Sequence, residues 1–294
     1  MADRFNDFFG QLNIGRQPTQ LHNRFFILKW DFSCVDPSGS VHDIRKSLHD
    51  HINSCTRSFS IRYQAYLPAA IPIDSDNAMN SIRSLDDAVR QTPYPVYLLI
   101  DEYDNFANEV MMDMADGLKT YESLVYEKGP LKTLFKAVKS LSVGSSVART
   151  FITGVSPVVL SDITSGYNIA ENIYLNPQFN TLCGFTESEV RDALAKVVHA
   201  AHQEQTDHAL DMMRTWYNGY RFAADAVERV YNPTLALYFM KAFQQTGASP
   251  RKILDANLST DRGKLEYFTG AFHRASDASG YRQPPAGRCH SRYH

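Results

Sequence analysis

The chain has little cysteine, no excess of charge of one sign and no long apolar run. Its cysteines form no C-x-x-C pair, which argues against a zinc site and favours a reducing, intracellular compartment. With 30 Lys+Arg against 32 Asp+Glu and a net charge of -2, the molecule has no overall field that would attract nucleic acid or acidic lipid. No apolar run approaches the ~20 residues that a bilayer span needs, so we expect neither export nor a membrane anchor.

A phosphate-binding loop is also missing. None of the 15 glycines opens the pattern G-x-x-x-x-G-K-[ST], whose backbone wraps nucleotide phosphates. The nearest segment, Gly117-Leu118-Lys119-Thr120, lacks the first glycine of the pattern and has Leu118 between its glycine and its lysine. The 294 residues, 44% of them hydrophobic, are nevertheless sufficient for one large core or two small ones.

The most informative segment that is present runs from Tyr94 to Asp104. Its residues Val96–Ile100 are apolar almost without interruption, which is typical of a strand buried on both faces of a parallel sheet. The run ends abruptly in Asp101 and Glu102, so the pattern predicts a buried strand that carries two carboxylates to its carboxyl end.

The order of elements around this strand predicts an α/β fold. Helical spacing of apolar residues and Gly or Pro stops separate the candidate strands, as expected of a parallel sheet with helical crossovers. The expected strands are Phe25–Ser33, Val96–Ile100, Arg149–Val155 and a short one at Ile173–Leu175. Two helices are expected, from Val41 to about Tyr66 and from Met79 to Val89, and a long, mostly helical stretch is expected after the second strand, through Leu131 to a break at Val143.

A smaller, mainly helical region follows. Thr186 precedes Glu189 by three residues just before an apolar helical series, which is the pattern of a capping box. Beyond it, Trp216–Phe222 indicates a glycine-centred turn, and the stretch from about His273 is too poor in aliphatic residues to fold. We therefore expect three parts: an α/β core at 1–182, a helical lid-like domain at 183–272 and a disordered tail at 273–294.

The polar residues at the strand ends suggest phosphate chemistry. Asp101 could hold Mg²⁺ through water while Glu102 polarises an attacking water, although an Asp-Glu pair can also merely end a strand. Thr153 could sense a γ-phosphate or hold the attacking water, although Thr before Gly is also ordinary turn chemistry. Arg221 and Arg262 could reach a phosphate, although most such arginines are solvated surface residues.

Several further segments occur together in a familiar order. They are Tyr103-Asp104, Ile152–Pro157, Cys183–Thr186, Tyr217–Tyr220, Tyr231–Pro233, and Asp255–Leu258 with Asp261-Arg262. Their identity and order resemble the AAA-ATPase-like domain that commonly precedes a PD-(D/E)XK nuclease-like domain. The resemblance runs from about residue 5 to about residue 268.

This resemblance implies a P-loop NTPase-like fold that binds ATP and Mg²⁺, with a nuclease-like domain or another protein as partner. It makes Asp101 the Walker B acid of the metal site, Glu102 the catalytic acid and Thr153 the sensor residue. In the family the phosphate loop precedes the segment that resembles Phe5–Gly15. We therefore expect a fragment that lacks the Walker A strand, with ATP hydrolysis belonging to the full-length form and this chain inactive alone.

Two other functions remain open on sequence grounds. The first is a degenerate, non-catalytic module that keeps the surfaces of the fold for protein contacts. The second is local nucleic-acid binding through the helical region, where the aromatic segment Trp216–Phe222 lies beside Arg214. Packing around a glycine turn is the competing explanation for that segment.

Overall fold

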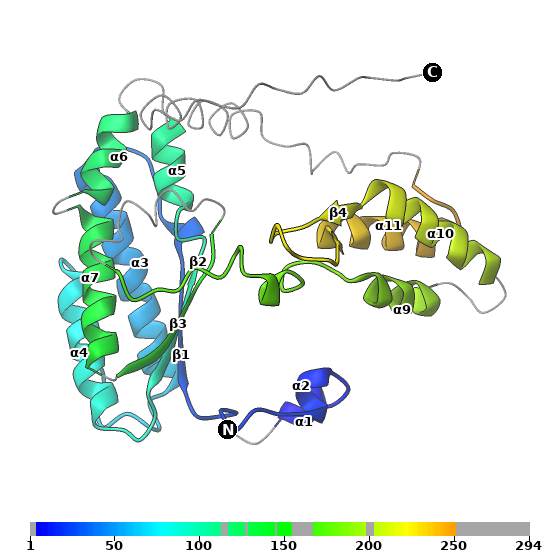
Figure 1. The fold of residues 1–294 in the computed structure, drawn as a ribbon. Helices are drawn as coiled ribbons and strands as arrows, with labels where there is room; N and C mark the ends of the chain where they lie inside the picture. Colours follow the sequence, from blue (N-terminus) through cyan, green and yellow to red (C-terminus); the bar gives the residue numbers. More distant parts are fainter. Residues whose placement is uncertain are drawn as a thin grey trace. The chain divides into compact units, whose positions relative to one another are not determined.

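The computed structural model describes residues 4–112, 117–126, 129–144, 146–154, 167–197 and 203–250. The chain divides into two compact units, Met1–Ala170 and Glu171–His294 (Figure 1). The predicted tail from about His273 and the candidate Arg262 lie outside the described residues.

The first unit is built on a parallel sheet of three strands. These are β1 (Phe26–Asp31), β2 (Val96–Asp101) and β3 (Val147–Ile152), hydrogen-bonded in the order β1-β2-β3. All three had been predicted as strands from their apolar and β-branched residues. The α/β class predicted for this part of the chain is confirmed.

Helices connect these strands. The longest, α3, begins after a capping box in which Ser40 and Asp43 bond each other's backbone amides, and it ends at Arg62. The helices of this unit are α1 (Phe5–Phe9), α2 (Asn13–Arg16), α3 (Val41–Arg62), α4 (Ala78–Arg90), α5 (Asn105–Met112), α6 (Gly117–Val125) and α7 (Pro130–Val143), with a 3-10 turn, η1, at Phe32–Cys34. The two predicted helices correspond to α3 and α4, and the predicted helical stretch contains α5, α6 and α7.

The crossover helices α3, α4 and α7 lie on the same side of the sheet (Figure 1). Two successive crossovers that advance in one direction and share the usual right-handed sense place their helices on one face. In β2, Val96, Leu98 and Ile100 are buried beneath these helices, whereas the alternate residues are only partly buried. The prediction that Val96–Ile100 is buried on both faces is therefore wrong for the described structure, because only one face is fully covered.

The core of the first unit lies between the sheet and these helices. Trp30 and Phe32 are fully buried at the end of β1, and their rings stack with centroids 6.4 Å apart. Phe106 of α5 packs edge-on against Phe32 at 5.9 Å. These aromatic contacts brace the end of β1 and the turn that follows it, next to the polar residues described below.

The second unit is mainly helical. Its elements are η2 (Pro177–Phe179), α9 (Glu187–Val197), α10 (Gln203–Trp216), β4 (Asn218–Tyr220), β5 (Val230–Tyr231) and α11 (Pro233–Thr246). The predicted capping box is present: the Thr186 amide donates to Glu189 Oε2 at 2.8 Å, and the Glu189 amide donates to Thr186 Oγ1 at 3.3 Å. None of the described helices combines the length and apolar content needed to cross a bilayer.

Two local predictions in this unit are wrong. Ile173–Leu175 forms no strand but a turn, in which the Asn176 amide donates to the Ile173 carbonyl at 3.1 Å. Gly219 does not centre a turn; it lies within β4, which pairs antiparallel with β5 through an irregular register. Its φ of 141° is a conformation that glycine adopts readily, so the residue allows a bulge in the strand.

Candidate functional site

The three parallel strands bring polar residues together at their carboxyl ends. Asp31, the last residue of β1, pairs in register with Asp101, the last residue of β2. Thr153 follows β3 directly, and the ladder continues there: its amide donates to the Ile100 carbonyl at 2.8 Å, and its carbonyl accepts from the Tyr103 amide at 3.1 Å. The backbone pairing therefore fixes the relative positions of Asp31, Asp101 and Thr153.

The Asp101 carboxylate is held on both of its oxygens. Thr153 Oγ1 donates to Oδ1 at 2.5 Å, and the Lys29 ammonium lies 3.0 Å from Oδ2. The hydroxyl of Thr153, followed by the ammonium of Lys29, lowers the pKa of Asp101 below its ordinary value. Because its side chain is 42% exposed, this ionised carboxylate remains open to an incoming ligand.

Asp31 shares the same lysine. Its Oδ2 lies 3.3 Å from Lys29 Nζ, while its Oδ1 accepts from the Ser33 hydroxyl at 2.7 Å and from the Ser33 amide at 3.3 Å. The Ser33 hydroxyl is the main cause of the lowered pKa of Asp31, and the contact with Asp101 is the main cause of the raised pKa of Lys29. One ammonium thus serves two ionised carboxylates.

Glu102 has an unusual backbone. Its φ is 51°, in the left-handed region that non-glycine residues enter at an energetic penalty of roughly 1–2 kcal/mol. Its carbonyl accepts from the Asn105 amide at 3.0 Å, so the turn leads directly into α5. Such strain concentrates at functional positions, and here it belongs to the residue predicted as the catalytic acid.

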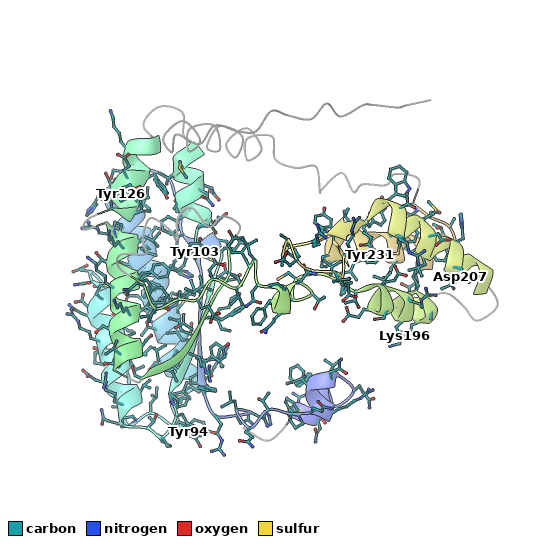
Figure 2. The ribbon with its side chains drawn as sticks, in the orientation of Figure 1. Tyr94, Tyr103, Tyr126, Lys196, Asp207 and Tyr231 are labelled. Carbon is teal, nitrogen blue, oxygen red and sulfur yellow. The ribbon has the colours of Figure 1, made fainter. Side chains whose placement is uncertain are left out.

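The segments that follow β2 and β3 lie close together at the Glu102 turn. Tyr103, labelled in Figure 2, is 4% exposed, and Asp104 is fully buried and accepts from Asn108 Nδ2 at 2.8 Å. A Cβ atom added to Gly154 would overlap both the Tyr103 ring and the Asp104 carboxylate. Gly154 therefore allows the segment after β3 to lie against the segment after β2.

The donor set at the strand ends suits a hard divalent cation. Carboxylate and hydroxyl oxygens are preferred by Mg²⁺, which keeps several waters and takes only one or two carboxylates from a protein. The Lys29 ammonium already lies within 3.3 Å of both Asp31 and Asp101, so the pair accommodates positive charge. Among the described residues, no group of three or more His, Cys, Asp or Glu side chains forms a complete metal cage.

The structure brings together three of the five residues singled out from the sequence: Asp101, Glu102 and Thr153. Arg221 belongs to the second unit, where its Nη1 donates to the Ala226 carbonyl at 3.4 Å, and Arg262 is not among the described residues.

The sequence reasoning missed Lys29 and Asp31. Asp31 ends an apolar strand just as Asp101 does, and this pattern could have marked it. The lysine gave no such signal, because its role depends on the register between β1 and β2.

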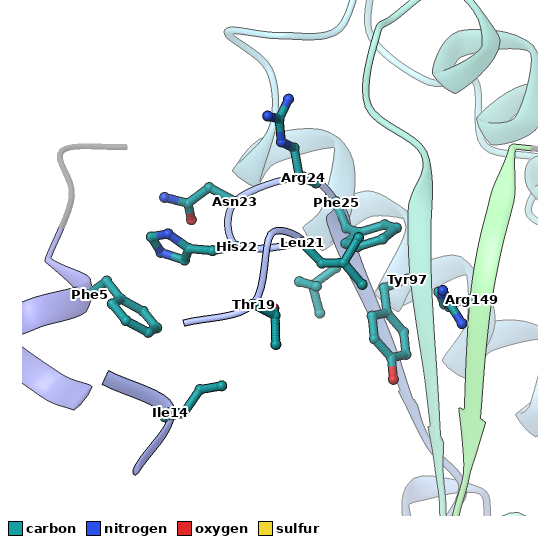
Figure 3. Close-up of a pocket in the computed structure, with 11 residues that line it drawn as sticks. Phe5, Ile14, Thr19, Leu21, His22, Asn23, Arg24, Phe25, Tyr97 and Arg149 are labelled. Atoms are coloured by element: carbon teal, nitrogen blue, oxygen red, sulfur yellow. The ribbon is translucent and has the colours of Figure 1, made fainter. Parts of the chain in front are cut away.

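A pocket of about 500 Å³ lies elsewhere on the first unit (Figure 3). It is lined by apolar and polar residues of the N-terminal segment and by Ile27, Tyr97 and Arg149, which pair across the amino-terminal ends of the strands. Asp101 follows Tyr97 by four residues, a distance of roughly 13 Å along a strand. The pocket is therefore separate from the carboxylate site.

Comparison with known proteins indicates the family of the chain. An uncharacterized protein in the vnfD 5′ region of Azotobacter chroococcum mcd 1 is 29% identical over 147 residues, which cover 50% of this chain and 25% of that protein. The chain thus spans about a quarter of this relative. No solved structure gives a significant match. The family model described as "Predicted AAA-ATPase" matches residues 1–164, and the chain therefore belongs to the AAA-ATPase-like family.

Proposed function

We propose that the first unit supplies the carboxylate side of a Mg²⁺-ATP site. The observation that carries the proposal is the hydrogen bond from Thr153 Oγ1 to Asp101 Oδ1 at 2.5 Å, which joins the ends of two adjacent parallel strands. Open α/β sheets bind ligands at this edge. Membership of the AAA-ATPase-like family makes nucleotide the best supported ligand.

The residues divide the chemistry among them. Asp101 holds the cation through water, Glu102 accepts the proton of the attacking water, and Thr153 orients that water or contacts the terminal phosphate. Bound Mg²⁺ would offset the charge that develops on the transferred phosphate. Asp101 is suited to its role because Thr153 and Lys29 keep its carboxylate ionised.

The other half of the site is a phosphate loop, and the printed 294 residues contain no G-x-x-x-x-G-K-[ST] motif. We propose that turnover requires a longer form in which such a loop precedes Phe5. In that form, a nuclease-like domain or another protein is the partner whose state the ATPase cycle would change. Arg221 and Arg262 remain candidate phosphate ligands within this proposal.

ATP turnover of the printed chain and of a longer form that carries the loop tests the assignment. We expect turnover only in the longer form, and Glu102→Gln should reduce kcat by about 10²-fold or more while ATP binding persists. Glu109→Gln is the matched control, because Glu109 lies seven residues away on α5, where it accepts from Asn105 Nδ2 at 2.8 Å. Equal turnover in the Glu102→Gln and Glu109→Gln forms would refute the catalytic assignment.

The second candidate is a non-catalytic interaction module. It is favoured by the incompletely covered face of the sheet, on which Ile27 and Phe151 are each 37% exposed. This function predicts that Mg²⁺-ATP leaves the melting temperature unchanged in both the printed chain and the longer form. A nucleotide bound only to the native state must raise that temperature, so the melt separates the two functions.

A further inference from the structure

Lys29 lies at the centre of the strand-end cluster. It precedes Asp31 by two residues in β1, so both side chains emerge on the same face of the sheet. Their neighbours Leu28 and Trp30 point into the core and are at most 4% exposed, which anchors the strand. The Asp31 amide donates to His51 Nε2 at 3.2 Å and further fixes the end of β1.

Among the residues that the structure describes, the two aspartates at the strand ends share a single lysine. Asp31 and Asp101 are each held ionised, and the Lys29 ammonium contacts both carboxylates, at 3.3 Å and 3.0 Å. Its side chain is 52% exposed and its stem has four rotatable carbons, so the ammonium can leave without disturbing the core. The stoichiometry of one ammonium for two carboxylates is what a removable counter-ion requires.

We propose that Lys29 is a positioning residue that acts as the internal counter-ion of Asp101, so that an incoming divalent cation must displace its ammonium from the Asp31–Asp101 pair. This inference rests on the proposed Mg²⁺-ATP site. Lys29 thereby keeps Asp101 aligned between the strands while no cation is bound, and it sets the affinity that a cation must have to enter.

Titration of the 294-residue protein with Mn²⁺ tests the displacement. Binding is monitored by calorimetry or by the electron paramagnetic resonance signal of free Mn²⁺. Lys29→Met keeps the length of the side chain without its charge and should bind Mn²⁺ roughly two- to fivefold more tightly, because an exposed ion pair no longer has to be broken. Lys29→Arg restores the charge and should return affinity to the wild-type level. Lys46→Met is the matched control, because Lys46 forms an ion pair with Asp50 on α3, away from the strand ends.

The Asp101→Asn variant separates this inference from the proposed function. Loss of Mn²⁺ binding in Asp101→Asn together with tighter binding in Lys29→Met supports both. Loss in Asp101→Asn with unchanged or weaker binding in Lys29→Met overturns the role of Lys29 alone. Binding that is indifferent to Asp101→Asn overturns the proposed site, and absence of binding to every variant, Lys29→Met included, overturns both.

A second measurement follows Lys29 directly in the unmodified protein. Amine labelling quantified by peptide mass spectrometry should show that saturating Mg²⁺ increases labelling of Lys29 and leaves Lys46 unchanged. Equal labelling of Lys29 with and without Mg²⁺, under conditions where Mn²⁺ binds through Asp101, would mean that the cation enters without displacing the ammonium and would overturn the inference.

Discussion

The strand-end cluster of the first unit and the Glu187 cluster of the second unit use the same chemistry to different ends. The Glu187 carboxylate accepts hydrogen bonds from Arg214 Nε at 3.0 Å and Nη2 at 2.5 Å. It also accepts one from the hydroxyl of the buried Tyr231 (labelled in Figure 2) at 3.2 Å. Three donors therefore converge on one carboxylate. Lys29, in contrast, is one ammonium divided between Asp31 and Asp101.

The number of donors for each carboxylate distinguishes a structural charged cluster from one that is available to a ligand. A two-pronged arginine contact is geometrically demanding and leaves little capacity on Glu187, so that cluster joins α9, α10 and β5. Asp101, in contrast, receives one hydroxyl and one ammonium, is 42% exposed, and precedes the strained backbone of Glu102. The following predictions break or sharpen this contrast, from the largest expected effect to the smallest.

Gly154→Ala should disturb the strand-end cluster most. The added Cβ meets the Tyr103 ring and the Asp104 carboxylate, neither of which can move easily in a buried environment, so we expect the first unit to lose about 1–3 kcal/mol of unfolding free energy. Denaturation followed by Trp30 fluorescence in a Trp216→Phe background reports on this unit, because the chain has two tryptophans.

Gly144→Ala is the control for this measurement. There the nearest atom to an added Cβ is the flexible end of Arg90, which can swing away. If Gly154→Ala lowers the free energy of unfolding no more than Gly144→Ala does, the close approach of the two loops is not required for stability.

Glu102→Gly should stabilise the first unit even though it removes the proposed catalytic acid. Glycine relieves the strain of the left-handed backbone, but the unfolded chain gains freedom at the same position. The net effect should raise the free energy of unfolding by roughly 0.5–1 kcal/mol. Glu109→Gly, within helix α5, should instead lower the free energy of unfolding by about 1 kcal/mol. The same Trp30 denaturation assay compares the two variants, and a loss in both would show that the Glu102 side chain contributes more to stability than its strain removes.

Acid should weaken the second unit through Glu187. Contact with Arg214 is the main cause that lowers the pKa of Glu187 below its ordinary value of 4.5, so its stabilising effect is complete above about pH 4.5 and is lost as the pH falls through the lower native value. Since the side chain is 37% exposed, solvent screening limits the effect to a few tenths of a kcal/mol.

Amide exchange of α9 and α10 between pH 6 and pH 3 measures this loss. Glu187→Gln should flatten the part of the pH dependence that comes from this residue. A pH dependence that is the same in the variant and in the wild type would assign the acid sensitivity of the unit to other groups.

Much of the secondary structure could be predicted from local patterns. The apolar run that ends at Asp101 and the helical spacing in α3 and α4 are properties of neighbouring residues, and they were interpreted correctly. Ile173–Leu175 was misassigned because a short apolar triplet does not distinguish a strand from a turn without a pairing partner. The coverage of β2 was misassigned because it depends on which side of the sheet the crossovers run.

The candidate site divides in the same way. Asp101 and Glu102 are adjacent in the chain, so their common position at a strand end could be predicted, and Thr153 was marked by its own place at the end of the next candidate strand. Lys29 and Asp31 precede Asp101 by about seventy residues, and their contact with it arises only when β1 and β2 pair with Asp31 opposite Asp101.

The amino-acid sequence by itself determined the α/β class, the identity of the carboxylates at the end of β2, the absence of a phosphate-loop motif among these 294 residues and the resemblance to the AAA-ATPase-like family. Those properties follow from hydrophobic periodicity and from residues close together in the chain. The tertiary structure decided that Lys29 bridges two aspartates, that Thr153 donates to Asp101, that Glu102 has a left-handed backbone and that one face of the sheet is incompletely covered. The physical reason is that strand register and crossover side are set by packing across the whole unit, which no local pattern encodes.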